Sequence, residues 1–203
     1  MSQEDGMVLS PRFEQALVYA TIAHAGQVRK GTRIPYISHP LIVAGLALEH
    51  GADEDEAIGA LLHDVAEDCG GKPRLADIRS RFGDRVAAIV DGCTDTYVRP
   101  KPPAAERKAA HVQHLRDQQN GSVLLVSACD KLANARAILN DYREMGEALW
   151  DKFSVDRSVT LGYYRSLADL FLTRLPSPLS HEVERVVTAI ETAAGSPTSE
   201  LPK

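Results

Sequence analysis

Residues 61–68 read Leu61-Leu62-His63-Asp64-Val65-Ala66-Glu67-Asp68. This run places four ionisable side chains directly after an apolar stretch. In a helix, residues four apart lie on the same face, so Glu67 follows His63, and Asp68 follows Asp64, by one turn. Residues 50–70 contain no Lys or Arg that would pair with these acids. Burying so much charge is costly unless it is paired or bound to a metal. The pattern therefore predicts a metal site with a catalytic acid beside it.

The segments on either side of this run have the apolar spacing of helices, and glycines and prolines separate them. Asp53 followed by Glu56 resembles a capping box, with Asp in place of Ser or Thr. No segment shows a convincing strand pattern. The sequence therefore predicts an all-α, single-domain helical bundle. We expect its helices over residues 13–23, 40–50, 53–68, 75–82, 84–93, 106–119, 122–139, 155–172 and 181–194.

The length of 203 residues suits one domain. We expect a flexible N-terminus over residues 1–10, the folded domain over 11–194, and a Ser/Pro-rich disordered tail over 195–203. The polar, acidic start does not resemble a signal peptide, and no apolar stretch approaches the length of a membrane span. The sequence thus predicts a cytoplasmic protein that does not engage a membrane.

The composition is 44% hydrophobic and 25% charged, which is typical of a globular protein. A formal net charge of −5 argues against binding a nucleic-acid polymer. It is compatible with a small polyanionic ligand, because local charge and any bound cation decide that interaction. The three cysteines form no CxxC pair, so we expect reduced thiols rather than disulfides or a zinc finger.

Three further residues are candidate partners for His63 and Asp64. They are His39 at a helix entry, Asp130 within an otherwise apolar helix, and His24 at the end of the first helix. A lone histidine is more often structural than a ligand, but an isolated buried aspartate needs a cation or hydrogen-bond donors. Two imidazoles and two carboxylates from three helices suit Mn²⁺, Fe²⁺ or Zn²⁺. They do not suit a Cys-rich structural zinc site.

The order His39, then His63-Asp64, then Asp130 resembles the motif order of the HD-domain metal-dependent phosphohydrolases. More narrowly, the motifs are similar to those of the RelA/SpoT-type alarmone hydrolases, and above all to those of the small, stand-alone metazoan SpoT-homologue class. The resemblance extends over residues 13–172. The matching segments are His24–Gln27, Arg29–Gly31, Pro35–Pro40, Leu61–Asp68, Phe82-Gly83 and Asp130–Asn134.

The resemblance implies a bundle of the HD-domain type, with Mn²⁺ as the usual cofactor and Zn²⁺ or Fe²⁺ as other divalent ions. It implies hydrolysis of the 3′-pyrophosphate of ppGpp or pppGpp to GDP or GTP, and thus a role in the stringent response. The implied metal ligands are His39, His63, Asp64 and Asp130. The implied catalytic pair is Glu67 and Asp68, and the implied nucleotide contacts are Arg29, Lys30 and Asn134.

These residue types suit those roles. A carboxylate one turn from a metal ligand can accept a proton from the attacking water or orient that water. The alternative is that Glu67 and Asp68 form a solvated helix end without a catalytic role. Arg29 can stack on a purine or bind a phosphate, or it can belong to a solvated basic loop. Asn134 follows Asp130 by one turn and shares its face. Lys131 points about 100° away round the helix and ranks lower.

Two other residues have supporting roles in this interpretation. His24 matches a family histidine that is not a ligand, so we expect a structural or supporting role for it. Tyr36 is placed to support the site by packing or hydrogen bonding.

Departures from the family pattern leave the substrate open. Ser127 stands where many members carry Lys, and the proline-rich loop at 97–105 is longer than usual. Arg99, Lys101, Arg107 and Lys108 are candidates to supply the phosphate-binding charge instead. The alternative is a related enzyme that prefers another nucleotide, such as (p)ppApp or NADPH.

A third interpretation is a non-catalytic alarmone sensor or a partner-binding helical protein. Such a protein is expected to lose a metal ligand or the Glu67-Asp68 pair, and all of these are present. We expect no synthetase domain after residue 172, and an oligomer is compatible with the sequence.

Overall fold

The computed structural model describes residues 8–195. The expected flexible N-terminus and disordered tail therefore fall mainly on residues 1–7 and 196–203, which lie outside the described residues. Contacts divide the described residues into two compact units, the first formed by 8–29 and 33–94 and the second by 30–32 and 95–195. Within 8–195 every regular element is a helix, apart from an isolated bridge between Val28 and Pro35. The expected all-helical architecture is confirmed.

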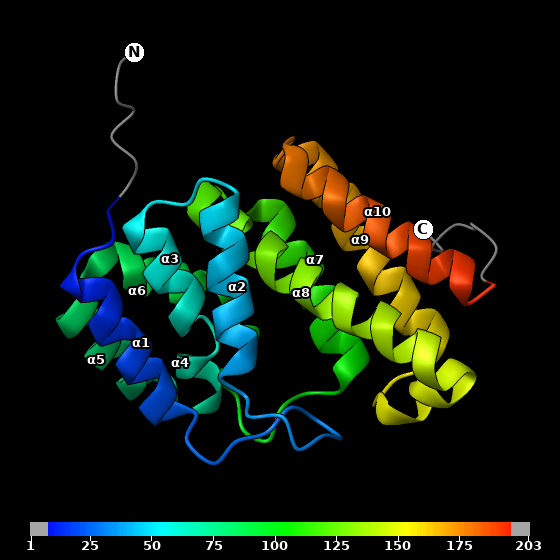
Figure 1. Ribbon diagram of the computed structural model, residues 1–203, viewed down its shortest axis with the longest axis horizontal. Coiled ribbons are helices and arrows are strands. Elements are labelled where there is room, and N and C mark those ends of the chain that lie inside the picture. The colour runs from blue at the N-terminus through cyan, green and yellow to red at the C-terminus, as the bar shows by residue number, and fades with distance from the viewer. Residues whose placement is uncertain (1–7, 196–203) are drawn as a thin grey trace. The chain divides into compact units, whose positions relative to one another are not determined.

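Helices α1 to α6 make up the first unit (Figure 1). Helix α3 is central, because α1, α2 and α6 all pack against it, while α5 contacts both α4 and α6. The bounds of these helices are α1 (Pro11–Ala23), α2 (Ser38–Glu49), α3 (Glu54–Leu62), α4 (Val65–Asp68), α5 (Gly71–Phe82) and α6 (Asp84–Cys93).

Helix α3 begins with the predicted capping box and then becomes apolar on all sides. The Asp53 carboxylate accepts from the amide of Glu56 at 3.0 Å, and the Glu56 carboxylate accepts from the amide of Asp53 at 2.9 Å. Every residue from 57 to 62 is buried. A helix that is apolar on all faces belongs in a core, so α3 carries His63 at its C-terminal end into the interior of the unit.

A close approach between α3 and α6 depends on Gly59. A methyl group built there would lie 2.6 Å from Cγ2 of Ile89, and the β-branched side chain of Ile89 has little freedom to move away. Overpacking of a core costs about 1–3 kcal/mol, whereas alanine gains about 1 kcal/mol over glycine in a helix. We therefore expect Gly59→Ala to lower the free energy of unfolding by about 1 kcal/mol.

Gly45 provides the matched control for this substitution, because it is exposed in α2 and a Cβ there would meet nothing within 4 Å. Gly45→Ala should therefore raise the free energy of unfolding by up to about 1 kcal/mol. Urea unfolding of both variants checks the opposite signs. A stabilised Gly59→Ala protein would contradict the tight contact between α3 and α6.

Helices α7 to α10 make up the second unit (Figure 1). Helices α8, α9 and α10 pack against one another, α7 packs on α9, and a short 3₁₀ segment packs on α8. The bounds are α7 (Ala104–Asp117), α8 (Gly121–Met145), the 3₁₀ segment η1 (Gly146–Lys152), α9 (Arg157–Arg174) and α10 (Pro178–Ala193).

Helix α8 is the long central element of this unit, and its middle is buried over residues 126–130. Helix α10 starts with a capping box in which Ser177 and Ser180 bond each other's backbone amides at 3.1 and 3.3 Å. Arg165 of α9 pairs with Glu191 of α10 at 2.5 Å. The burial of α8 places Asp130 in an apolar setting, as the sequence predicts.

The helix predicted over 122–139 extends to Met145, the one predicted over 75–82 starts at Gly71, and the one predicted over 53–68 is interrupted. The helix expected over 53–68 ends at Leu62, and α4 begins only at Val65. The imidazole of His63 donates through Nδ1 to the carbonyl of Ala60 at 2.7 Å, which competes with the helical bond to that carbonyl. Asp64 then adopts φ −91° and ψ −12°, in the bridge region of the backbone map. The break therefore comprises His63 and Asp64, and α4 with Glu67 and Asp68 follows it.

None of the helices within residues 8–195 combines the length and the apolar character that a bilayer span requires.

Candidate metal centre

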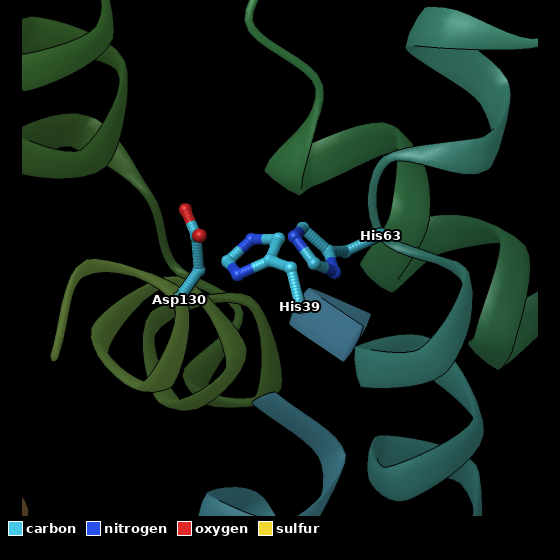
Figure 2. A group of neighbouring side chains, drawn as sticks. All are labelled: His39, His63 and Asp130. Carbon is cyan, nitrogen blue, oxygen red and sulfur yellow. The ribbon is translucent and has the colours of Figure 1, made fainter. Parts of the chain in front are cut away.

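Two buried histidines of the first unit face each other. His39 is the second residue of α2, and His63 follows the last residue of α3; each is only 3% exposed. Their ring centroids lie 5.2 Å apart, and Figure 2 shows both imidazoles side by side. The packing of α2 on α3 therefore brings together two ligands that lie far apart in sequence.

The bonding of His63 fixes which of its nitrogens is a ligand. A carbonyl oxygen only accepts, so the contact from Nδ1 to the Ala60 carbonyl requires a proton on Nδ1. In the neutral imidazole this leaves Nε2 with a lone pair, as metal-binding histidines require. Oδ2 of Asp64 lies 3.1 Å from that Nε2 and 3.7 Å from Nε2 of His39.

This arrangement needs a positive charge. Two acceptor atoms at 3.1 Å repel each other unless a proton or a cation lies between them. Both imidazoles are buried and the carboxylate is 24% exposed, so bulk water screens the repulsion poorly. The nitrogen and oxygen donors of His39, His63 and Asp64 thus fit a divalent transition-metal ion.

The fourth predicted ligand belongs to the second unit. Asp130 lies on α8 and is 7% exposed. Asn134 donates through Nδ2 to Oδ1 at 2.6 Å, and Nζ of Lys131 lies 2.6 Å from Oδ2. Asp130 is thus held by the amide one turn away, as the shared face predicts. Like His39 and His63 in the first unit, Asp130 is buried and offers one ligand atom.

Lys131 is more closely involved than its helical angle suggested. Its four-carbon stem lets the ammonium group reach back to Asp130. Burial disfavours the charged ammonium, yet the Asp130 carboxylate holds the pKa of Lys131 well above its usual value. A count of degrees round the helix ignores the length of the side chain, and for that reason the sequence ranked Lys131 too low.

The predicted catalytic pair lies on α4. Glu67 is half-buried and Asp68 is exposed. The amide of Asp68 donates to the carbonyl of Asp64 at 2.9 Å, so these two residues keep the one-turn spacing. The break at residues 63–64 means that Glu67 and His63 do not share a single regular helix.

The predicted nucleotide contacts fall in both units. Arg29 belongs to the first unit, and its guanidinium carbon lies 5.9 Å from the centre of the Tyr36 ring. Lys30 is exposed and belongs to the second unit, as does Asn134 on α8. Asn134 donates to Asp130, so it orients a predicted ligand in addition to any contact with a nucleotide.

His24 makes local contacts at the end of α1, and its supporting role stays a prediction. It is 3% exposed at the end of α1. Its Nδ1 lies 2.8 Å from Oε1 of Gln27 and 3.6 Å from Sγ of Cys69. These contacts fasten the loop that follows α1.

The sequence did not reveal a half-buried basic and aromatic cluster in the second unit. Nζ of Lys108 lies 3.9 Å from the centre of the Tyr163 ring, and Nδ1 of His111 lies 3.0 Å from the Tyr163 hydroxyl. Burial, followed by the charge of Lys131, lowers the pKa of Lys108 to about 8 and that of His111 to about 3. The available signal was the one-turn spacing of His111 and Leu115, both buried, on the helix expected over 106–119.

Lys108→Met should raise the free energy of unfolding at pH 7 by about 1 kcal/mol, because the burial penalty of the ammonium exceeds a cation–π attraction of about 0.5–1 kcal/mol. The folded pKa of about 8 lies below the ordinary 10.5. The unfolded chain therefore binds more protons between these values, and wild-type stability rises with pH there. The advantage of the variant should shrink from pH 8 upward. Urea unfolding at pH 7 and 9.5 measures it.

Lys72→Met is the control, because Lys72 is 62% exposed and pairs with Asp91 at 3.0 Å on the surface. It should change stability by less than about 0.5 kcal/mol at either pH. A Lys108→Met advantage that is absent at pH 7, or that stays constant up to pH 9.5, would contradict the burial of the Lys108 charge.

Known proteins were compared with this fold and site. A family model described as HD domain matches residues 16–153. The guanosine-3′,5′-bis(diphosphate) 3′-pyrophosphohydrolase of Vibrio cholerae is 35% identical over 129 residues, which is 61% of this chain and 17% of that protein. The bifunctional (p)ppGpp synthase/hydrolase SpoT of Escherichia coli is 33% identical over 132 residues, which is 63% of this chain and 18% of that protein. The chain thus spans less than a fifth of the length of these relatives.

Two solved structures share the fold. One, described as a metazoan ortholog of SpoT that hydrolyzes ppGpp, superposes with a TM-score of 0.74 at 23% identity, covering 90% of this chain and 97% of that one. A crystal structure of a Listeria monocytogenes protein gives a TM-score of 0.66 at 27% identity, covering 76% of this chain and 99% of that one. The resemblance inferred from the motifs is confirmed: the chain belongs to the HD domain family and is related to RelA/SpoT-type enzymes.

Proposed function

We propose that this protein is a metal-dependent phosphohydrolase whose ion is held by His39, His63, Asp64 and Asp130. The observation that carries the proposal is the 3.1 Å contact between Nε2 of His63 and Oδ2 of Asp64, two acceptor atoms that a bound cation would bridge. Asp130 supplies a further buried carboxylate. Its partners Asn134 and Lys131 fix its orientation, as outer partners of metal ligands do.

Two imidazoles and two carboxylates suit Mn²⁺, and also Fe²⁺ or Zn²⁺. When bound, such an ion lowers the pKa of a coordinated water and offsets the charge of the phosphates. Mn²⁺ is the proposed native ion because the RelA/SpoT-type motifs imply it. The same ion would relieve the repulsion between a polyanionic substrate and the acids around Asp64.

Glu67 and Asp68 are the proposed catalytic residues. Asp68 lies one turn from Asp64, and Glu67 lies beside it on the same short helix. A carboxylate at that distance from a ligand can accept a proton from the attacking water or orient it. We assign both residues to this task jointly.

The proposed substrate is ppGpp or pppGpp. The names of the related Vibrio cholerae and Escherichia coli proteins, and the description of the metazoan structure, support this choice. In the proposed reaction, water adds to the phosphorus attached to the 3′ oxygen, and the bond between that oxygen and phosphorus breaks. The products are GDP or GTP, with the 3′ hydroxyl restored, and pyrophosphate. Arg29, Lys30 and Asn134 are the proposed nucleotide contacts.

The test is incubation of the Mn²⁺-loaded full chain with ppGpp, followed by quantification of GDP and pyrophosphate in equal amounts. Parallel reactions with ppApp and NADPH compare kcat/KM among nucleotides. The proposal requires ppGpp to be the preferred substrate. Preference for ppApp or NADPH would support the proposed phosphohydrolase activity and contradict the proposed substrate. No turnover of any of the three nucleotides would contradict the proposed activity itself. A cytoplasmic location and any oligomeric state stay predictions.

A further inference from the structure

Tyr36 binds the metal-site carboxylate directly. Its hydroxyl donates to Oδ2 of Asp64 at 2.5 Å. This is the same oxygen that lies 3.1 Å from Nε2 of His63 and 3.7 Å from Nε2 of His39. A carboxylate oxygen has two lone pairs, so one can receive the tyrosine proton while the other is directed to the histidines. The hydroxyl therefore selects the orientation of Asp64 that a ligand needs.

The Tyr36 ring is itself held in place. Its centroid lies 4.8 Å from that of the tilted His24 ring. It lies 5.9 Å from the centroid of His39, and the Tyr36 and His39 rings meet edge to face. On the backbone, the Tyr36 amide donates to the carbonyl of Gln27 at 2.9 Å, and the His39 amide donates to the carbonyl of Tyr36 at 2.9 Å. A donor fixed in this way holds the carboxylate instead of following it.

Arg29 adds a second connection to the ring. Its guanidinium carbon lies 5.9 Å from the ring centre, near the outer limit of a cation–π contact. The return of the loop through Tyr36 thus links a proposed nucleotide contact, Arg29, to a proposed ligand, Asp64. The orientation of Asp64 depends on this loop as well as on the helices that flank it.

We infer that Tyr36 is a positioning residue for the metal ligand Asp64. The inference rests on the proposed metal site. Outer hydrogen-bond partners of metal ligands typically contribute about 10–100-fold to metal affinity. Tyr36→Phe keeps the ring and removes only the hydroxyl. We therefore expect it to weaken Mn²⁺ binding by about 10–100-fold.

Tyr19→Phe is the matched control. The Tyr19 hydroxyl also donates to an aspartate, Asp77, at 2.7 Å within the same unit. This control removes an equivalent bond elsewhere and should leave Mn²⁺ affinity unchanged. Calorimetric titration of the metal-free full chains with Mn²⁺, together with urea unfolding of the same samples, separates affinity from stability.

The outcomes are distinct. Wild-type protein that binds no Mn²⁺ would refute the proposed metal site itself. Wild type that binds while Tyr36→Phe binds equally well would overturn the role of Tyr36 and leave the metal site standing. Equal weakening in Tyr36→Phe and Tyr19→Phe would also overturn it, because the loss would then reflect general destabilisation. Weakening confined to Tyr36→Phe supports the inference.

Discussion

Asp64→Asn should abolish tight Mn²⁺ binding and lower kcat/KM for ppGpp by at least about 10³-fold. The substitution keeps the size of the side chain but removes the negative charge and makes it a poor ligand. Charge stabilisation by a catalytic metal is worth several kcal/mol, and each factor of ten in rate corresponds to about 1.4 kcal/mol. The asparagine can still accept from Tyr36, so the fold around the site should persist.

Metal content after desalting, and initial rates of GDP release, check this expectation. Asp91→Asn is the control, because Asp91 is an acid on α6 of the same unit whose side chain is 43% exposed and pairs with Lys72 at 3.0 Å. Asp91→Asn should retain the metal content and the initial rate of GDP release of the wild type. An Asp64→Asn protein that keeps stoichiometric Mn²⁺ would show that Asp64 is not a ligand.

The Glu67→Gln/Asp68→Asn double variant should bind Mn²⁺ as wild type does and lose about 10²–10⁴-fold in kcat, the usual contribution of a general base. Metal binding should survive because neither residue belongs to the proposed ligand set. The separation of the two properties distinguishes this variant from Asp64→Asn.

Calorimetry with Mn²⁺ and steady-state hydrolysis of ppGpp measure the two properties on the same preparation. Glu49→Gln/Asp91→Asn is the matched control, since it neutralises one exposed and one half-buried acid of the same unit. The single variants then show which carboxylate carries more of the effect. Unchanged hydrolysis in the double variant would leave the proposed mechanism without its catalytic residues.

Much of the fold follows from local pattern. Helix α6 has the predicted bounds, and the capping box at Asp53 starts α3 where the sequence places it. These features depend on residues within a few positions of each other, which a sequence displays directly. The break after Leu62 was not predictable in this way, because it accompanies a side-chain bond from His63 and the particular backbone angles of Asp64.

The candidate site likewise combines residues that the sequence predicted with contacts that it did not. Residue type and order identified His39, His63 and Asp64, and the first unit brings these three together. The sequence suggested a supporting role for Tyr36 but not its partner, because Tyr36 reaches Asp64 only through the return of an irregular loop. The reach of Lys131 to Asp130 was missed because rotation round a helix says little about a long flexible stem.

Helices α3 and α4 differ in how easily their backbone opens, and this difference separates His63 from Glu67 and Asp68. Residues 57–62 are buried on every side, so their amide protons can exchange with water only when the whole first unit opens. Helix α4 is a single turn that carries half-buried Glu67 and exposed Asp68, and such a turn frays locally at little free-energy cost. His63 is therefore anchored as firmly as the core itself, whereas Glu67 and Asp68 stand on a turn that can open locally.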